Sequence, residues 1–265
     1  MIDTNRPSVA RVYDCLLGGK DNYEADRQVL QQVDPLAPEL GTLVRAGRDW
    51  LLRVTRFLAG EARIDQFLDL GAGLPAAENE NTHQAAQRHN PDARVVYVDN
   101  DPVVAAHGRA RLEENDGTRL VMADLTDPDA VFADPDVTGL LDLTRPVALI
   151  HSSTMHHVPA DDEPAKIMRR YAELLPAGSY VALSHFTDPR DDGPGSALAA
   201  AVTDVFADCA APCHLRSRAE ILDLFAGLDL VDPGLVSLKS WWPDGPLLRT
   251  SAADAVALGA VARKD

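Results

Sequence analysis

The run of residues 66–75, which reads QFLDLGAGLP, constrains the fold of this chain more than any other stretch. Phe67, Leu68 and Leu70 are typical of a buried strand, and Asp69 interrupts them. A carboxylate in a buried strand is costly unless it is paired, so we expect Asp69 to face a ligand or backbone amides. Gly71 and Gly73 follow, and residues without a Cβ atom allow a sharp turn and the close approach of a ligand. The run therefore predicts a strand that ends in a nucleotide-binding loop.

Apolar runs alternate with helical patterns along the chain as far as residue 228. Such alternation is typical of an α/β fold with a mostly parallel, Rossmann-like sheet and helices on both faces. The last two apolar runs have no helical pattern between them, so they predict a hairpin that adds one antiparallel edge strand. The sequence thus predicts a seven-stranded sheet from residues 66–70, 94–98, 119–122, 147–151, 180–186, 228–240 and 256–262.

The amino-terminal segment has a different pattern. Apolar residues at helical spacing predict one amphipathic helix over residues 38–59, which ends near Gly60. Residues 6–23 mix apolar, polar and glycine residues without a single period, which suits a cap folded across a site. A chain of 265 residues can bury one large core. We therefore expect a single domain in which residues 1–60 form a helical cap and residues 61–265 form the core.

The charge balance disfavours one class of partner. The chain has 41 Asp and Glu against 25 Lys and Arg, a formal net charge of −16. Such a surface repels a phosphate backbone, so no nucleic-acid partner is expected. No apolar run approaches the roughly 18 residues of a membrane span, and the first residues lack the layout of a signal peptide. We expect a cytoplasmic protein without a membrane partner.

The cysteines predict neither a disulfide framework nor a metal site. Cys15, Cys209 and Cys213 are odd in number and widely separated, which fits reduced thiols. A metal site at Cys209, Cys213 and the adjacent His214 would lack a second ligand pair, and structural zinc needs four ligands. The sequence therefore predicts no metal.

Two further acids stand where predicted strands end. Asp99 closes the second strand, where a doubly wound sheet holds its ligand, and can accept hydrogen bonds from both hydroxyls of a ribose. Its alternative role is to cap the next helix, a role that we assign to Asp101. Asp124 follows the third strand and can accept from an exocyclic amine, with Leu125 beside the ring. The alternative for Asp124 is a solvated acid in an acidic run.

These residues resemble the motifs of class I S-adenosylmethionine-dependent methyltransferases. A nicotinamide-dependent oxidoreductase is the rival, but the GxGxxG pattern fails because Ala76 stands where the third glycine belongs. A protein that binds S-adenosylmethionine or its product without catalysis is a second alternative. The resemblance implies S-adenosylmethionine as cofactor and S-adenosylhomocysteine as product, held by Asp69, Gly71, Ala72, Gly73, Asp99, Asn100, Asp124 and Leu125.

A narrower resemblance covers nearly the whole chain. Residues 9–23, with Asp26 and Arg27, and then residues 73–75 with Asn81 and His83, are similar to an actinobacterial family of S-adenosyl methyltransferases that was formerly classed as a domain of unknown function. The resemblance implies the same fold and cofactor. It supplies no acceptor, which we expect to be a small molecule, and the oligomeric state stays open.

The amino-terminal block offers candidate contacts to the cofactor. If it closes over the site, Tyr13, Lys20 and Asn22 are placed to touch the cofactor. The alternative is a packing element in which two glycines simply make the turn. Arg11 and Arg27 can meet the carboxylate of the cofactor or form surface ion pairs.

Two histidines follow apolar runs at predicted strand ends. His151 and His185 are the candidates for a general base, because imidazole titrates near neutral pH. We expect His151 to lie closer to the cofactor and to contribute to its binding. His156 and His157 are expected in the neighbouring loop. Methyl transfer can also proceed without a base, because positioning alone can supply a large part of the barrier reduction.

Overall fold

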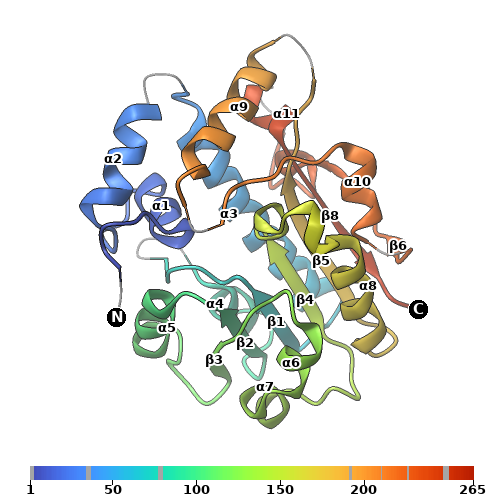
Figure 1. Cartoon of the computed structure of the whole chain (residues 1–265). Helices are drawn as coiled ribbons and strands as arrows, with labels where there is room; N and C mark the ends of the chain where they lie inside the picture. Colours follow the sequence, from blue (N-terminus) through green and yellow to red (C-terminus); the bar gives the residue numbers. More distant parts are fainter. Residues whose placement is uncertain are drawn as a thin grey trace.

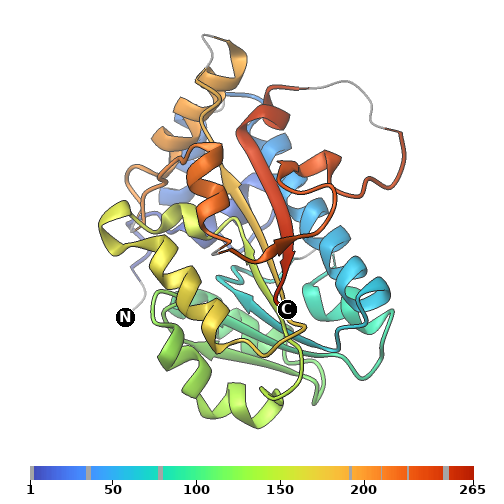
Figure 2. The same cartoon turned by 90° about the vertical axis from the view of Figure 1, so that its right-hand side faces the viewer.

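The computed structural model describes residues 3–33, 37–76, 80–190, 193–209, 211–225, 227–246 and 251–265. A twisted sheet stands at the centre, with helices packed on both of its faces (Figure 1 and Figure 2). The strands run in the order β3-β2-β1-β4-β5-β8-β6, and β7 pairs with β8. Their bounds are β1 Gln66–Leu70, β2 Arg94–Asp99, β3 Thr118–Met122, β4 Ala148–Ser152, β5 Tyr180–Phe186, β6 Asp229–Leu230, β7 Val236–Ser237 and β8 Ala257–Arg263.

The first five strands are parallel and agree with the predicted runs to within a residue at either end. Their side chains alternate between two cores, because successive residues of a strand face opposite sides. Phe67 packs into the core under one set of helices, and its neighbour Leu68 packs into the core on the other side. This two-sided burial is what an apolar strand in a parallel sheet requires. The predicted α/β fold class is confirmed.

Helices cover the two faces unequally. The first face carries α3 Leu40–Arg56, α4 Thr82–Gln87, α5 Pro102–Arg111, α9 Pro194–Phe206 and α11 Ala252–Val256. The second carries α6 Pro128–Ala133, α7 Pro135–Leu140, α8 Pro164–Leu174 and α10 Arg218–Asp223. Short 3₁₀ turns η2 Met155–His157, η3 Ala160–Asp162 and η4 Leu238–Ser240 join these elements. The predicted capping of α5 by Asp101 is confirmed, since its Oδ1 accepts from the backbone N–H of Val103 at 2.7 Å.

The carboxyl-terminal part of the sheet differs in detail from the prediction. The run 228–240 forms two short strands, β6 and β7, because Pro233 lacks an N–H and Gly234 turns the chain with a φ of +79°. The turn is closed by a hydrogen bond from the N–H of Gly234 to the carbonyl of Val231 at 2.8 Å. Over the described part of the chain the sheet therefore has eight strands, and the antiparallel strand β8 lies between β5 and β6 rather than at the edge.

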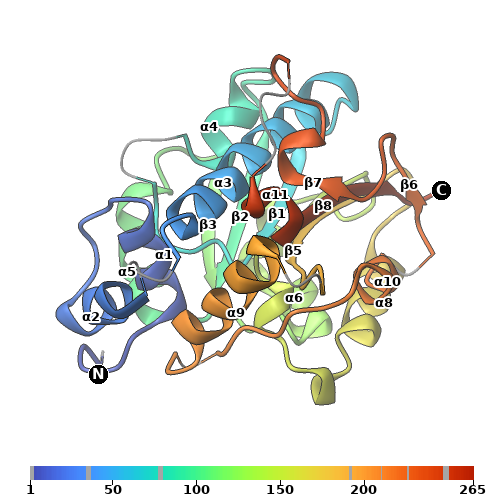
Figure 3. The same ribbon diagram turned by 90° about the horizontal axis from the view of Figure 1, so that it is seen from above.

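The amino-terminal helices lie against the first face of the molecule. The predicted helix 38–59 is α3, which continues into a π-helical turn η1, Phe57–Glu61. Upstream of it, α1 (Val9–Leu16) contacts α3, and α2 (Glu24–Val33) contacts α9, as Figure 3 shows from above. Of these two helices, α1 lies toward the carboxyl ends of the strands, and α2 packs behind it.

A buried ion pair ties α1 to α2. The Nε of Arg11 donates to Asp26 Oδ2 at 2.8 Å, and both side chains are almost completely buried. Asp26 also accepts from the backbone N–H groups of Ser8 and Tyr23. Arg27 binds Glu24 and Asn22. The two arginines that could have met a ligand carboxylate are thus engaged within the cap.

Candidate functional site

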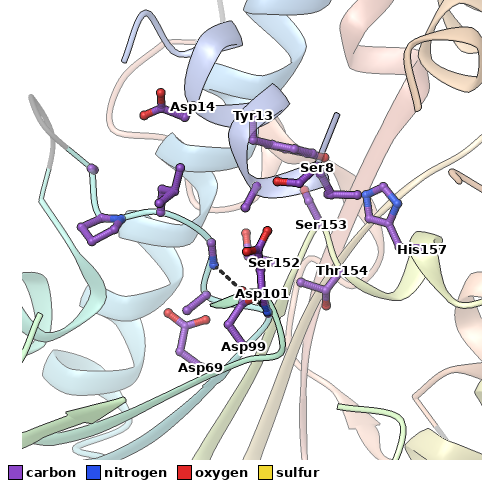
Figure 4. A pocket seen from close by; sticks show the side chains of 18 of the residues that line it. Ser8, Tyr13, Asp14, Asp69, Asp99, Asp101, Ser152, Ser153, Thr154 and His157 are labelled. Carbon is purple, nitrogen blue, oxygen red and sulfur yellow. Dashed lines mark hydrogen bonds between the residues drawn. The ribbon is translucent and has the colours of Figure 1, made fainter. Parts of the chain in front are cut away.

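A cavity of about 680 Å³ opens between α1, α3 and the carboxyl ends of strands β1 to β4. This volume lies within the range of small-molecule sites. Figure 4 shows its polar side chains, which come from the strand ends below and from α1 above. Most of the residues that the sequence analysis singled out line it, namely Tyr13, Lys20, Asp69, Gly71, Ala72, Gly73, Asp99, Asn100, Asp124 and Leu125.

The loop after β1 brings backbone rather than side chains to the cavity. Gly71 and Gly73 have φ angles of +71° and +67°. A Cβ atom at Gly71 would lie 2.4 Å from Cγ2 of Thr154, whereas a Cβ at Gly73 would meet no heavy atom within 4 Å. Gly71 therefore permits close packing against the neighbouring turn. Gly73 leaves open space, so a ligand can lie directly on the backbone.

Asp69, the last but one residue of β1, is buried beneath this loop. Its Oδ2 accepts from the hydroxyl of Thr82 at 2.6 Å. Burial raises the pKa of this carboxyl, and the Thr82 hydrogen bond and the charge of Arg48 partly offset the rise. A buried acid that lines a cavity is suited to a cationic ligand group.

Asp99 at the end of β2 fixes the shape of the loop. Its Oδ2 accepts from the N–H of Gly73 at 2.9 Å (Figure 4). Its Oδ1 accepts from the N–H of Asp101 at 2.9 Å. Burial raises the pKa of Asp99 to about 6, against these two hydrogen bonds, which favour the ionised form. A carboxylate oxygen can accept more than one hydrogen bond, so Asp99 can still accept from a ligand.

Asp124 and Leu125 stand at the end of β3. Asp124 Oδ1 accepts from the N–H and the hydroxyl of Thr126, at 2.9 and 2.8 Å. The carbonyl of Leu125 accepts from the hydroxyl of Tyr171 at 2.8 Å. These bonds hold the turn, so that Leu125 presents an apolar surface at this end of the cavity. The other carboxylate oxygen of Asp124 has no hydrogen-bond partner among the described residues.

Arg48 on α3 is a site residue that the sequence analysis missed. It lies between Val44 and Leu51 on one helical face, and all three residues line the cavity. Its Nη2 donates to the carbonyl of Glu80 and to Asn81 Oδ1, whereas its Nε has no partner among the described residues. Burial lowers the pKa of Arg48, and the charge of Asp69 opposes this. The available signal was a lone arginine on an otherwise apolar face.

The amino-terminal segment contributes Tyr13 and Lys20 to the lining, but not Asn22. The amide of Asn22 donates to Asp14 Oδ2 at 2.8 Å and to the carbonyl of Gly19 at 3.0 Å. Asp14 itself lines the cavity. Asn22 thus contacts Asp14, which lines the cavity, but does not line the cavity itself. It holds the turn after α1.

The two predicted catalytic histidines lie outside the lining of the cavity. His151 is fully buried, with Nδ1 3.1 Å from the hydroxyl of Thr154 and its ring against Tyr171. His185 donates from Nδ1 to the carbonyl of Phe186 at 2.6 Å, and its Nε2 accepts from Arg216 at 2.8 Å. Burial lowers the pKa of each to about 3. We correct both assignments, because neither residue lines the cavity. Nε2 of His151 is buried away from it, without a hydrogen-bond partner among the described residues.

The neighbouring histidines of η2 lie closer. His157 lines the cavity, and His156 is 3.3 Å from the hydroxyl of Tyr13 through its Nε2. His156 stacks on Phe186, and burial lowers the pKa of His156 well below the usual value.

Within the described ranges no helix is long and apolar enough to cross a membrane, and no group of three His, Cys, Asp or Glu side chains is arranged to hold a metal ion.

Comparisons with known proteins agree with this architecture. A family model described as S-adenosyl methyltransferase matches residues 1–265. The crystal structure of a candidate methyltransferase from Thermobifida fusca matches with 38% identity and a TM-score of 0.91, over 99% of this chain and 96% of that one. A DUF574 family protein from Streptomyces avermitilis is 39% identical over 100% of both chains, with a TM-score of 0.90. No curated protein matches the chain.

More distant structures share the fold alone. Human N-acetylserotonin methyltransferase, solved in complex with S-adenosylmethionine, is 13% identical, with a TM-score of 0.52 over 96% of this chain and 59% of that one. The N-methyltransferase NodS from Bradyrhizobium japonicum, solved with S-adenosylhomocysteine, is 12% identical, with a TM-score of 0.53 over 96% and 98% of the two chains.

Proposed function

The chain belongs to the S-adenosyl methyltransferase family, and on that premise we propose that it methylates a small organic acceptor bound between the cap and the strand ends. The methyl donor is S-adenosylmethionine. When bound, it supplies a sulfonium methyl group that is already activated for transfer. Neither the family nor the neighbours support a nicotinamide oxidoreductase or a non-catalytic binding protein.

The observation that carries the proposal is the cavity itself, with one acid at each of three adjacent strand ends. In the proposed arrangement Asp99 accepts from the ribose hydroxyls, while Asp124 and Leu125 hold the adenine. Asn100, which is exposed at the rim, flanks the ribose. The spacing of these residues over β1, β2 and β3 fits an adenosine that lies across the sheet edge.

The methionine end of the donor carries an ammonium and a carboxylate, and the cavity offers a partner for each. Asp69 is the buried acid, and Arg48 is the buried base whose Nε lacks a partner among the described residues. The open space at Gly73 lets the part of the donor between its methionine end and its adenosine lie close to the protein backbone. These residues therefore fit the donor. The contact with the donor carboxylate, which was one of two alternatives for Arg11 and Arg27, is assigned in this proposal to Arg48.

The cap supports a small acceptor rather than a macromolecule. Tyr13 from α1 lies over the strand ends, so the cavity is roofed by residues 8–21. In this proposal residues 1–60 serve as the cap of a single domain, which excludes water from the site when it closes. The net charge of −16 also opposes a nucleic-acid acceptor. A cytoplasmic location belongs to the same proposal, since the three cysteines are free.

The test is to follow the labelled methyl group. The protein is incubated with methyl-labelled S-adenosylmethionine and a cell extract, and the extract is then separated by ultrafiltration into small molecules and macromolecules. We expect label in the small-molecule filtrate. Label in protein or nucleic acid alone would contradict a small acceptor, and binding of the donor without any transfer would favour the non-catalytic alternative. A chain with Asp99→Ala is the matched control for donor-dependent labelling.

A further inference from the structure

The end of the cavity above β4 has a polar lining without charge. Tyr13 from α1, Ser153 just after β4 and His157 from η2 all contribute to it. Figure 4 shows Ser153 and His157 toward one side of the cavity, with Asp69 and Asp99 toward the other. Three segments far apart in the sequence thus bring a phenol, a hydroxyl and an imidazole to one place.

The charged side chains of the lining gather elsewhere. Its acids stand at the ends of β1 to β3 and on the cap segment 14–21. Asp21 of that segment forms an ion pair with Arg111 of α5 at 2.9 Å, which places the segment on the β2 side of the cavity. Burial lowers the pKa of His157 to about 4, so its ring is neutral at physiological pH. A cationic acceptor group would therefore find no counter-charge above β4.

Ser153 is held in a fixed conformation at the cavity, with its Oγ 3.3 Å from Ser184 Oγ. Its φ of +60° is uncommon for a residue with a side chain, and such strain gathers at functional sites. Its N–H donates to Ser184 Oγ at 2.9 Å, which fixes the turn. A Cβ at Gly47 of α3 would lie 3.5 Å from Ser153 Oγ, at ordinary van der Waals contact, so this hydroxyl lies directly beside α3. Ser153 also faces the phenol of Tyr13, whose raised pKa it partly lowers.

His157 offers an unused nitrogen. Its Nδ1 lies 2.8 Å from the carbonyl of Ala211, an acceptor, so Nδ1 carries the proton and Nε2 the lone pair. Nε2 is shielded from solvent and has no partner among the described residues. A buried acceptor without a partner is rare in folded proteins and calls for an explanation. Because His157 lines the cavity, a small turn of its ring would bring Nε2 to a ligand there.

We propose that Tyr13, Ser153 and His157 form the acceptor subsite, and that the acceptor is an uncharged molecule with a hydroxyl group that becomes methylated on oxygen. This rests on the proposed function, since it names the acceptor class for the same site. Tyr13 and Ser153 orient the acceptor oxygen by hydrogen bonds. Nε2 of His157 receives the hydroxyl proton.

The step balances in atoms and charge. A lone pair of the acceptor oxygen forms the bond to the methyl carbon as the carbon–sulfur bond breaks, and the bonding pair stays on sulfur. The O–H proton passes to Nε2, so the positive charge moves from sulfur to the imidazole. A protonated ether is a much stronger acid than an imidazolium ion, so a weakly basic histidine suffices as the proton acceptor once the new bond forms. The proton then leaves to water.

The test observes His157 directly, in protein that carries ¹⁵N-labelled histidine. Calorimetry first establishes saturation with S-adenosylhomocysteine, and a failure to bind would contradict the proposed function rather than the acceptor class. Phenol and 2-naphthol are then added as neutral hydroxyl probes, with benzylamine and 2-naphthylmethylamine as matched cations. We expect the unprotonated Nε2 resonance to move upfield and to saturate with the hydroxyl probes alone. The signal is assigned by its loss in His157→Gln, with exposed His89→Gln as the control.

Three results would overturn the proposal. They are a proton on Nε2 in the saturated protein, no shift with either hydroxyl probe, and an equal shift with the cationic probes. In the variant test, His157→Gln should keep the affinity for S-adenosylhomocysteine and lower the turnover of any reactive hydroxyl acceptor by about 10²–10⁴-fold. A large loss of that affinity instead would make His157 part of the donor site and contradict the acceptor role.

Discussion

The two ends of the cavity are built in different ways. Above β1 to β3, charged side chains are fixed by backbone amides of the strand-end loops, as Asp99 is by Gly73 of the loop after β1 and by Asp101 of its own loop. Above β4, neutral groups are fixed by contacts between distant segments, as the hydroxyl of Tyr13 is by His156. The first end is charged and is built mainly from the strand-end loops, whereas the second also depends on how α1 packs over β4. Changes to the cap should therefore affect the acceptor end first, and changes to the strand-end acids should affect the donor end.

The largest expected effect is a loss of local stability in α1 that leaves the sheet unchanged. Asp26→Ala removes the partner of a buried arginine, and an uncompensated buried charge costs about 3–5 kcal/mol. Because Arg11 is almost fully buried against Asp26, this cost should weaken the docking of α1. Hydrogen exchange should show faster exchange at the amides of α1, with the amides of β1 to β3 unchanged.

Glu24→Ala is the control for this change, because Glu24 forms an exposed ion pair with Arg27 in the same helix. Exposed pairs contribute little, so a loss of no more than about 0.5 kcal/mol is expected. Equal acceleration in α1 and in the sheet after Asp26→Ala would mean that the cap and the core unfold as one unit.

The second change tests the donor end. Asp99→Ala should weaken binding of S-adenosylmethionine by about 2–4 kcal/mol, because it removes a charged acceptor from two hydroxyl groups. Titration calorimetry measures the loss. Asp101→Ala is the control, since Asp101 caps α5 and should cost about 1 kcal/mol of stability with little change in affinity. Equal affinities of Asp99→Ala and the unaltered chain for S-adenosylmethionine would contradict the placement of the adenosine at the end of β2.

The third change sharpens the assignment within the donor end. Arg48→Met should weaken the binding of S-adenosylhomocysteine by about 1.5–3 kcal/mol, because a charge-assisted hydrogen bond is lost. Binding of 5′-methylthioadenosine should not change, because that ligand lacks the amino-acid carboxylate. Exposed Arg45→Met in the same helix is the control. A similar loss for both ligands would show that Arg48 acts by shaping the cavity rather than by meeting the carboxylate.

The smallest expected effect is a pH dependence of stability and donor binding, which arises at the charged end of the cavity and not at the neutral end. Burial raises the folded pKa of Asp99 to about 6, above its ordinary value. The folded chain therefore binds more protons than the unfolded one between about pH 4 and 6, and the contribution of Asp99 to the free energy of unfolding falls as pH rises through this window.

The ionised form of Asp99 is the one that accepts from ribose. At pH 5 only about one Asp99 in ten stays ionised, so the affinity for S-adenosylhomocysteine should fall by about tenfold from pH 7. Asp99→Asn, which cannot titrate at this position, should bind weakly with a flatter profile. The same slope in both proteins would assign the pH dependence to another group.

The parts of the fold that depend on local sequence were predictable. The ranges of the five parallel strands and the loop from Asp69 to Gly73 follow from apolar runs and glycines that are adjacent in the chain. The division of the run 228–240 into β6 and β7 was missed, because its apolar residues continue past Pro233 and Gly234. Both residues were visible, and both interrupt strands.

The site residues that depend on tertiary packing were not predictable. A histidine near a strand end can face the cavity or the core, since side chains alternate. His185 pairs with Leu258 of β8, and the strand continues to Phe186, so its ring lies in the packed interior. Arg48 was hidden on an apolar helical face, and the tautomer of His157 depends on Ala211, which lies in a distant segment.

A crystal structure of the complex with S-adenosylhomocysteine tests the central claim most directly. The account predicts the ribose hydroxyls within hydrogen-bond distance of Asp99 and the carboxylate beside Arg48. It also predicts that the sulfur atom faces the space between Tyr13, Ser153 and His157. An adenosine that lies above β4, with its sulfur turned toward β2, would reverse the two ends of the cavity and contradict the account.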